Sequence, residues 1–346
     1  MPGVVSGRGV GGTWCAFLSA CLAIGLVWLG GCAAGSGAAP ADRPPGLSLD
    51  APSAWPERID IPLEEHHGYL FLPVWIDGKT AGMFLLDTGA SLDVVATGVA
   101  GRLRLPESGR EGEAVGVGGT ASFGYRHAES MRFGPFDTGP KEIAAVDLQA
   151  LSRRTGFTVA GILGFRTMSS APFTIDYAGP TLTLYRPDRF VAPDSPYVTY
   201  RRLGGVSAVT AEVGRGRAVW MILDTGDAGA TTITSKALEQ WPELLAEGAG
   251  IGQGRSQGVG GTVTTRDTWL RELRVGRVIF PELEVSFEPL AAQLDRLPTP
   301  TGRIGGDVLR RVRLTFDPRN RRVYFEPRRS RTSAEVPAQA LPGATP

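Results

Sequence analysis

Two stretches of the chain share one pattern of apolar and polar positions. Residues 72–89 and residues 209–226 each contain an apolar run, a turn with glycine, a second apolar run and then Asp-Thr-Gly. The two stretches align without a gap. An apolar run, a short glycine turn and another apolar run predict a β-hairpin, here one that ends in a tight turn.

The likeness between the two stretches continues downstream in the same order. The matching pieces are Gly116-Val117-Gly118-Gly119 with Gly258-Val259-Gly260-Gly261, Gly161-Ile162-Leu163-Gly164 with Gly302-Arg303-Ile304-Gly305, residues 174–177 with 315–318, and the last strands, 181–185 with 322–325. Landmarks repeated in this way indicate a duplicated structural unit. We predict two β-rich lobes, an N-terminal lobe over residues 57–190 and a C-terminal lobe over residues 191–327. The proline-rich stretch 187–196 would link them.

Composition supports an all-β reading. The 346 residues include 47 Gly and 26 Pro, which favour turns over long helices. Many short strands between turns predict an all-β protein, here two tandem pseudo-symmetric β-barrel lobes with a cleft between them. The net charge is +1 and no basic helix stands out, so we expect no nucleic-acid partner.

The first 56 residues have the pattern of a secreted, anchored protein. Arg8 precedes an apolar stretch that ends in Leu-Gly-Gly before Cys32, which is typical of a signal peptide over residues 1–31. The ending resembles a bacterial lipobox, in which Cys32 becomes the lipidated first residue. The alternative is an uncleaved N-terminal anchor. Both place the body in the cell envelope, in the periplasm or extracellular space, held to a membrane.

The segments that flank the body have a different composition. Residues 32–56 are rich in Ala, Gly, Pro and Ser and predict a flexible tether. Residues 328–346 have a similar composition and predict a disordered tail. No cysteine follows Cys32 and only three histidines occur, so we expect no disulfide framework, no metal and no cofactor in the body.

Asp-Thr-Gly occurs three times, and the context separates the copies. Apolar runs lead directly into Asp87 and Asp224, which predicts that buried strands deliver these carboxyls to turns inside the fold. The copy at Asp137 has no such run and predicts a surface turn. An Asp in a turn commonly bonds its own backbone two residues on, so one copy alone would carry no function.

Two matching lobes give the pair of aspartates a chemistry. A pseudo-twofold axis would bring Asp87 and Asp224 face to face, where two like charges cannot both ionise. One carboxyl then keeps a proton while the other acts as a base, an arrangement known from aspartic proteases. Gly89 and Gly226 would allow the sharp turns. The hydroxyls of the two following threonines, Thr88 and Thr225, could lock the turns together.

These residues resemble the active-site motif of the pepsin and retropepsin family of aspartic peptidases. The resemblance covers about residues 57–327. It implies a catalytic dyad of Asp87 and Asp224 supported by Thr88, Gly89, Thr225 and Gly226. It also implies two glycine-rich flaps, formed by Gly116, Val117, Gly118 and Gly119 and by Gly258, Val259, Gly260 and Gly261. Tyr125 could be a flap aromatic.

Two departures from the family pattern stand out. Asp227 replaces the usual small residue after the second Asp-Thr-Gly, where a third carboxylate would raise the proton affinity of the dyad if it faced the pair. In the N-terminal lobe, Phe165-Arg166 stands where the C-terminal lobe has Gly306-Asp307. Neither departure removes a catalytic group.

We therefore expect an aspartic-type endopeptidase that acts on a protein or peptide substrate as a monomer with an intramolecular pseudo-dimer. One alternative keeps the fold without the chemistry, as a lipoprotein that binds a peptide or an envelope component. Another pairs each lobe with its twin in a second chain. The distance between the Asp87 and Asp224 carboxyls separates the first of these from a protease.

Overall fold

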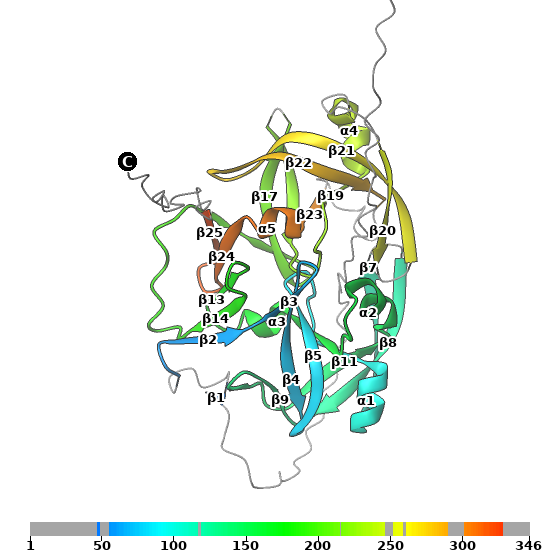
Figure 1. Ribbon diagram of the computed structural model, residues 1–346, viewed down its shortest axis with the longest axis vertical. Coiled ribbons are helices and arrows are strands. Elements are labelled where there is room, and N and C mark those ends of the chain that lie inside the picture. The colour runs from blue at the N-terminus through cyan, green and yellow to red at the C-terminus, as the bar shows by residue number, and fades with distance from the viewer. Residues whose placement is uncertain are drawn as a thin grey trace, which may run out of the picture.

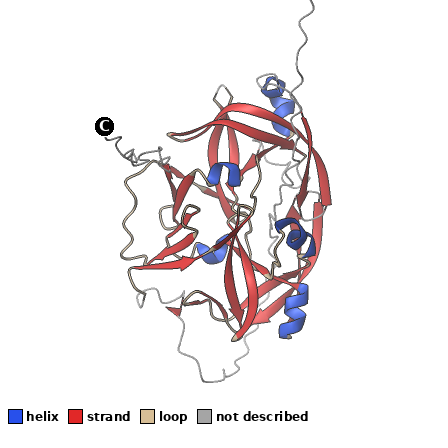
Figure 2. Ribbon diagram, viewed as in Figure 1, coloured by secondary structure: helices blue, strands red, loops and turns tan. Residues whose placement is uncertain are grey.

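The computed structural model describes residues 47–48, 55–116, 119–214, 216–245, 252–258, 261–289 and 301–327. Strands dominate this part of the chain and the helices are short (Figure 2), which confirms the predicted all-β class. Some predicted features lie outside these residues: the signal peptide, Cys32, the tail at 328–346, and the flap residues Val117, Gly118, Val259 and Gly260. None of the described helices is both long and apolar enough to cross a membrane.

An 11-stranded sheet forms the N-terminal lobe. Strand β3 (Glu64–His66) pairs with β4 at the side of the main path. In order across the sheet the other strands are β1 (Leu47–Ser48), β10 (Phe136–Asp137), β9 (Met131–Phe133), β4 (Tyr69–Ile76), β5 (Lys79–Asp87), β12 (Gly161–Gly164), β6 (Val94–Ala96), β11 (Lys141–Val146), β8 (Gly119–Ala128) and β7 (Glu107–Gly116).

An 8-stranded sheet forms the C-terminal lobe. Its strands in order are β16 (Arg201–Leu203), β17 (Val206–Val213), β18 (Arg217–Leu223), β23 (Thr301–Ile304), β19 (Thr231–Thr234), β22 (Val278–Glu288), β21 (Gly261–Val275) and β20 (Gly252–Gly258). Strand β17 also pairs with β21, which curls the sheet back on itself.

The two lobes repeat one arrangement around the strand that leads to each Asp-Thr-Gly. Strand β5 pairs antiparallel with β4 and parallel with β12, and β18 pairs in the same way with β17 and β23. The strands β12 and β23 are the duplicated glycine-flanked segments of the sequence. Each lies directly beside the strand that leads to its Asp-Thr-Gly and then pairs antiparallel with β6 or β19. The internal repeat is therefore a repeat of structure.

The last strands of the two halves join a third sheet, which departs from the prediction of two self-contained lobes. Its six strands in order are β15 (Tyr197–Thr199), β25 (Arg322–Pro327), β24 (Val312–Asp317), β13 (Phe173–Asp176), β14 (Thr181–Tyr185) and β2 (Arg58–Pro62). At its centre Thr174 pairs with Thr315, and their hydroxyls form a 2.7 Å hydrogen bond. Each half contributes three strands, so this sheet fixes the lobes to each other (Figure 1).

Short helices cap the sheets. They are α1 (Thr97–Leu103), α2 (Gln149–Thr155), α3 (Phe165–Met168), α4 (Lys236–Gln240) and α5 (Gly306–Leu309), with a 3-10 helix, η2 (Pro242–Leu245). Helices α3 and α5 each follow a glycine-flanked strand. Because they begin within a residue or two of the end of β12 or β23, they lie close to the Asp-Thr-Gly turns at Asp87 and Asp224.

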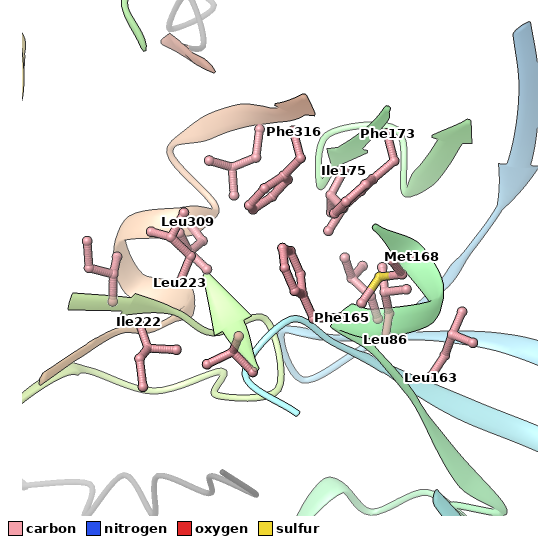
Figure 3. Packing of buried hydrophobic residues seen from close by; sticks show 14 of the residues in the cluster. Leu86, Leu163, Phe165, Met168, Phe173, Ile175, Ile222, Leu223, Leu309 and Phe316 are labelled. Carbon is pink, nitrogen blue, oxygen red and sulfur yellow. The ribbon is translucent and has the colours of Figure 1, made fainter. Parts of the chain in front are cut away.

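One apolar core runs through both lobes and the shared sheet. Phe165, at the start of α3, packs edge-on against the stacked rings of Phe173 of β13 and Phe316 of β24, with ring centroids 6.2 and 5.7 Å away (Figure 3). Tyr200 contacts the same ring at 6.0 Å. The departure at Phe165 thus has a structural reason, because this side chain fills the space where the two halves meet.

The end of the predicted tether is not a free linker. Leu47–Ser48 forms β1, parallel to β10, and the indole of Trp55 donates a 2.9 Å hydrogen bond to the carbonyl of Ser48. Trp55 is buried, and its ring lies 4.5 Å from that of Phe136. Burial of an indole favours a fixed position, so the N-terminal lobe includes residues before 57.

Candidate active site

Two central strands deliver the two aspartates to the middle of the molecule. Asp87 is the last residue of β5, and Asp224 follows β18 directly. Both side chains are 1% exposed. Three apolar residues precede each aspartate, and these residues belong inside a sheet that is covered on both faces. The predicted burial of both carboxyls is therefore observed.

Each aspartate closes its own turn. Asp87 Oδ1 accepts the backbone N–H groups of Gly89 (2.8 Å) and Ala90 (3.0 Å). Asp224 Oδ1 accepts the N–H of Gly226 at 3.0 Å. These bonds orient the carboxyls and leave Oδ2 of each for another partner.

The two carboxyls lie beside the opposite lobe's glycine. A Cβ placed on Gly89 would overlap the carboxyl of Asp224, and a Cβ placed on Gly226 would overlap the carboxyl of Asp87. Both overlaps are closer than the 3.0 Å that real Cβ atoms respect. Glycine is therefore required at both positions for the approach of the dyad, not only for the turn.

The two threonines bind the lobes together with four hydrogen bonds. Thr88 Oγ1 donates to the carbonyl of Leu223 (2.6 Å) and accepts the N–H of Thr225 (3.1 Å). Thr225 Oγ1 donates to the carbonyl of Leu86 (2.8 Å) and accepts the N–H of Thr88 (3.0 Å). Both threonines are fully buried. The predicted interlocking of the turns is present in this geometry.

Burial and the neighbouring carboxyl act on Asp87 in the same direction. Loss of water raises the pKa of Asp87 well above its ordinary value of 3.8, and the charge of Asp224 and a hydrogen bond with Asp224 raise it further. The N–H groups of Gly89 and Ala90 work against this rise. Such a pair shares one proton, which provides an acid and a base at one place.

A family model for aspartyl proteases matches the chain twice, at residues 72–167 and 209–308. The two matches cover more than half of the chain and fall one on each lobe. The chain belongs to the aspartyl protease family. The resemblance to retropepsin-like proteases is thereby confirmed, with two tandem units. No curated protein matches the chain.

The third Asp-Thr-Gly is a control within this member of the aspartyl protease family. Asp137 Oδ1 accepts the N–H of Gly139 at 2.9 Å, so the same turn forms here as at the dyad. The turn begins at the end of a two-residue strand at the side of the N-terminal sheet and is half-buried, and Asp137 Oδ2 accepts the hydroxyl of Ser130 at 2.8 Å. The tripeptide thus specifies a turn, and the duplicated strand arrangement specifies the pair.

Asp227 is bonded to the loop that follows it. Its side chain is buried, and its Oδ1 accepts the N–H of Gly229 at 2.9 Å. Its backbone carbonyl accepts the N–H of Gly306 at 2.7 Å. Asp227 therefore supports the loop that leads to α5.

The two predicted flaps are the ends of two hairpins. Strands β7 and β8 pair up to Gly116 with Gly119, and β20 and β21 pair up to Gly258 with Gly261. Both hairpins lie along the right-hand side of the view in Figure 1. Tyr125 is buried against Phe123, with ring centroids 5.1 Å apart, and Arg110 lies over its ring. Tyr125 therefore packs inside the N-terminal lobe.

Sequence reasoning missed a charged neighbour of the dyad. Arg303, in the middle of β23, has its Nε 3.9 Å from Asp224 Oδ2, and its Nη2 is paired with Glu288. The signal was present in the repeat, because Arg303 stands where the first copy has Ile162.

Among the described residues no group of three or more His, Cys, Asp or Glu is placed to hold a metal ion.

Proposed function

We propose that this protein is an endopeptidase that hydrolyses peptide bonds with a water molecule activated by Asp87 and Asp224. The observation that carries the proposal is the buried pair of carboxyls, one from each lobe, each lying against the opposite lobe's glycine. The pKa of Asp87, raised by burial and by Asp224, supports a shared proton. Membership of the aspartyl protease family supports a protein or peptide substrate.

The reaction divides the roles between the two aspartates. The ionised carboxyl, assigned to Asp224, takes a proton from water as the water oxygen bonds to the peptide carbonyl carbon. Asp87 donates its proton to the carbonyl oxygen, which yields a neutral tetrahedral diol. The proton on Asp224 then passes to the peptide nitrogen, the C–N bond breaks, and Asp87 takes back a proton from a diol hydroxyl. The dyad returns to its starting state with one proton.

Asp87→Asn and Asp224→Asn test this proposal in the full chain. Each removes one proton-transfer group without changing the side chain's shape, so cleavage of a peptide mixture should fall by about 10³-fold or more. Asp137→Asn is the matched control, since it makes the same change in the same turn away from the dyad. Mass spectrometry of the cleaved peptides measures all three variants against the wild type.

Full activity of either dyad variant would contradict the proposal. A wild type that binds a statine-type transition-state analogue but cleaves no peptide would favour the alternative of a binding lipoprotein. Loss of activity in Asp137→Asn equal to that in the dyad variants would show that the assay reports folding and not chemistry.

The location and assembly of the enzyme are part of the proposal. We infer from the sequence that Cys32 is lipidated and that the body lies in the cell envelope. Cys32→Ser should release the protein from membranes, and the mass of the mature N-terminus should reveal the lipid. Because both aspartates and all four threonine bonds come from one chain, we also propose an active monomer. Sedimentation of the active species at two concentrations tests this.

A further inference from the structure

The two catalytic strands have different neighbours at the same position. Arg303 pairs in register with Ile222 of β18, and Ile162 pairs in register with Leu85 of β5. Ile162 is fully buried in an apolar cluster that includes Phe71 and Val94. The fold therefore accepts an aliphatic side chain at this position, and the arginine in the C-terminal lobe is not required by the architecture.

Arg303 is held between two carboxylates. Its side chain is 11% exposed, its Nε lies 3.9 Å from Asp224 Oδ2, and its Nη2 pairs with Glu288. Glu288, the last residue of β22, is itself 4% exposed. Removing two charges from water costs several kcal/mol per ion, and buried pairs often add no net stability over apolar residues. A buried pair beside one catalytic carboxyl therefore calls for a functional reason.

The charges around the dyad are unequal on its two sides. Asp224 faces Asp87 across the lobes and Arg303 from β23, with Glu288 behind Arg303. Asp227, three residues on, turns its carboxyl to the N–H of Gly229. On the side of Asp87 the corresponding position is Ile162, and the Asp87 carboxyl is bonded to backbone N–H groups and to Asp224. A cation 3.9 Å from one carboxyl favours the charged form of that carboxyl.

We propose that Arg303 is a positioning residue that assigns the two roles in the dyad. It holds the negative charge on Asp224, so that the shared proton resides on Asp87. Glu288, paired with Arg303, weakens the effect of the arginine on Asp224. This inference rests on the proposed peptidase function and adds to it the reason why two identical residues act differently. The raised pKa of Asp87, caused first by burial and then by Asp224, agrees with this division.

The test is the acidic limb of the pH profile of kcat/KM, which reports ionisation of the dyad in the free enzyme. In Arg303→Met the charged form of Asp224 loses its cation, so the midpoint of the acidic limb should move to a pH about one unit higher. In Glu288→Gln the arginine loses its carboxylate partner, so the midpoint of the limb should move to a lower pH. Arg303→Lys keeps the charge and should restore the limb to within about a third of a unit of the wild type.

Two further variants control for folding and for total charge. Arg303→Met leaves Glu288 without its cation, so the double variant Arg303→Met/Glu288→Gln removes the orphaned charge. Its limb should still move up, by about half a unit, because Arg303 lies nearer the dyad than Glu288 does. Arg217→Leu removes an arginine paired with Glu243 at the far end of β18, about 20 Å along the strand. Its limb should not move.

Folded variants of Arg303 and Glu288 whose limbs stay with the wild type would overturn the inference while leaving the protease intact. Shifts of the same sign in Arg303→Met and Glu288→Gln would also overturn it. If the wild type cleaves no peptide, the proposed function fails, and carbon-13 NMR titration of the dyad decides the inference separately. A titration of the dyad that is unchanged by Arg303→Met would then refute it.

Discussion

The two lobes place their backbones alike around the dyad and surround it with different side chains. Each has a central strand, a turn, a threonine that reaches across and a glycine that admits the opposite carboxyl. Ile162 in the N-terminal lobe corresponds to Arg303, Phe165 to Gly306 and Arg166 to Asp307. The groups that define the dyad are thus symmetric, while the packing and the charge next to them are not. The symmetric backbone elements bring the two carboxyls together, and the different side chains beside them give the two carboxyls different surroundings.

The largest effect should come from the residue that breaks the symmetry of packing. Phe165→Ala would leave a cavity beside the stacked rings of Phe173 and Phe316, so the free energy of unfolding should fall by about 3–5 kcal/mol. The counterpart in the other lobe is Gly306→Ala, whose Cβ would lie 2.7 Å from Arg310 Nη1 and 3.0 Å from Ala228 Cα. The Arg310 side chain can shift, so this change should cost about 1 kcal/mol. Urea unfolding measures both. Equal losses of unfolding free energy in the two variants would contradict the conclusion that Phe165 fills the space where the two halves meet.

Asp307 provides a test of the charge asymmetry. Burial raises the pKa of Asp307 from 3.8 to about 6, although Thr231 donates a 3.1 Å hydrogen bond to it. The folded state therefore binds this proton more tightly than the unfolded state does. The contribution of Asp307 to the free energy of unfolding falls as the pH rises from about 4 to above 6, by at most about 3 kcal/mol.

Asp307→Asn removes this titration, so the free energy of unfolding of the variant should rise relative to wild type between pH 4 and pH 7. Urea unfolding at each pH gives the difference. Asp188→Asn, at a side chain that is 63% exposed, is the control and should follow the wild type. Parallel curves for Asp307→Asn and wild type would mean that Asp307 titrates normally in the folded protein.

The smallest effect should be the symmetric one. Thr88→Val and Thr225→Val each remove two hydrogen bonds and leave a buried N–H and a buried carbonyl of the opposite lobe without them. Each should lower the free energy of unfolding by about 1–2 kcal/mol, with similar values. Thr138→Val, in the third Asp-Thr-Gly, should change it by less than about 0.5 kcal/mol. A large difference between the unfolding free energies of Thr88→Val and Thr225→Val would show that the two threonines contribute unequally to the connection between the lobes.

The sequence was sufficient to predict what is local and duplicated. Apolar runs before Asp87 and Asp224 and the glycine-flanked strands after them marked the strands that carry the two aspartates, because each pattern is repeated in the same order. The turn chemistry of Asp-Thr-Gly is also local, and it forms even at Asp137, where the other carboxyl oxygen accepts the hydroxyl of Ser130. Repetition was the evidence that distinguished the pair from the single copy.

Pairing between distant segments was not predictable in the same way. Nothing in residues 173–176 or 312–317 indicates that these strands pair with each other and not within their own lobes. The contact of Arg303 with Asp224 and Glu288 likewise depends on which strands become neighbours. The sequence shows Arg303 only as a charge in place of Ile162 in the repeat, without the carboxylates that it contacts.

The shared sheet also sets the order in which the molecule can be completed during synthesis. Strand β13 has β14 on one side, and its other side is filled only by β24, with β25 and β15 beyond. Strands β24 and β25 come from the last residues described, 312–327. Until they leave the ribosome, the N-terminal half presents an open strand edge, which is a site for pairing with another chain. The sheet that joins the two lobes can therefore be completed only after β24 has been synthesised.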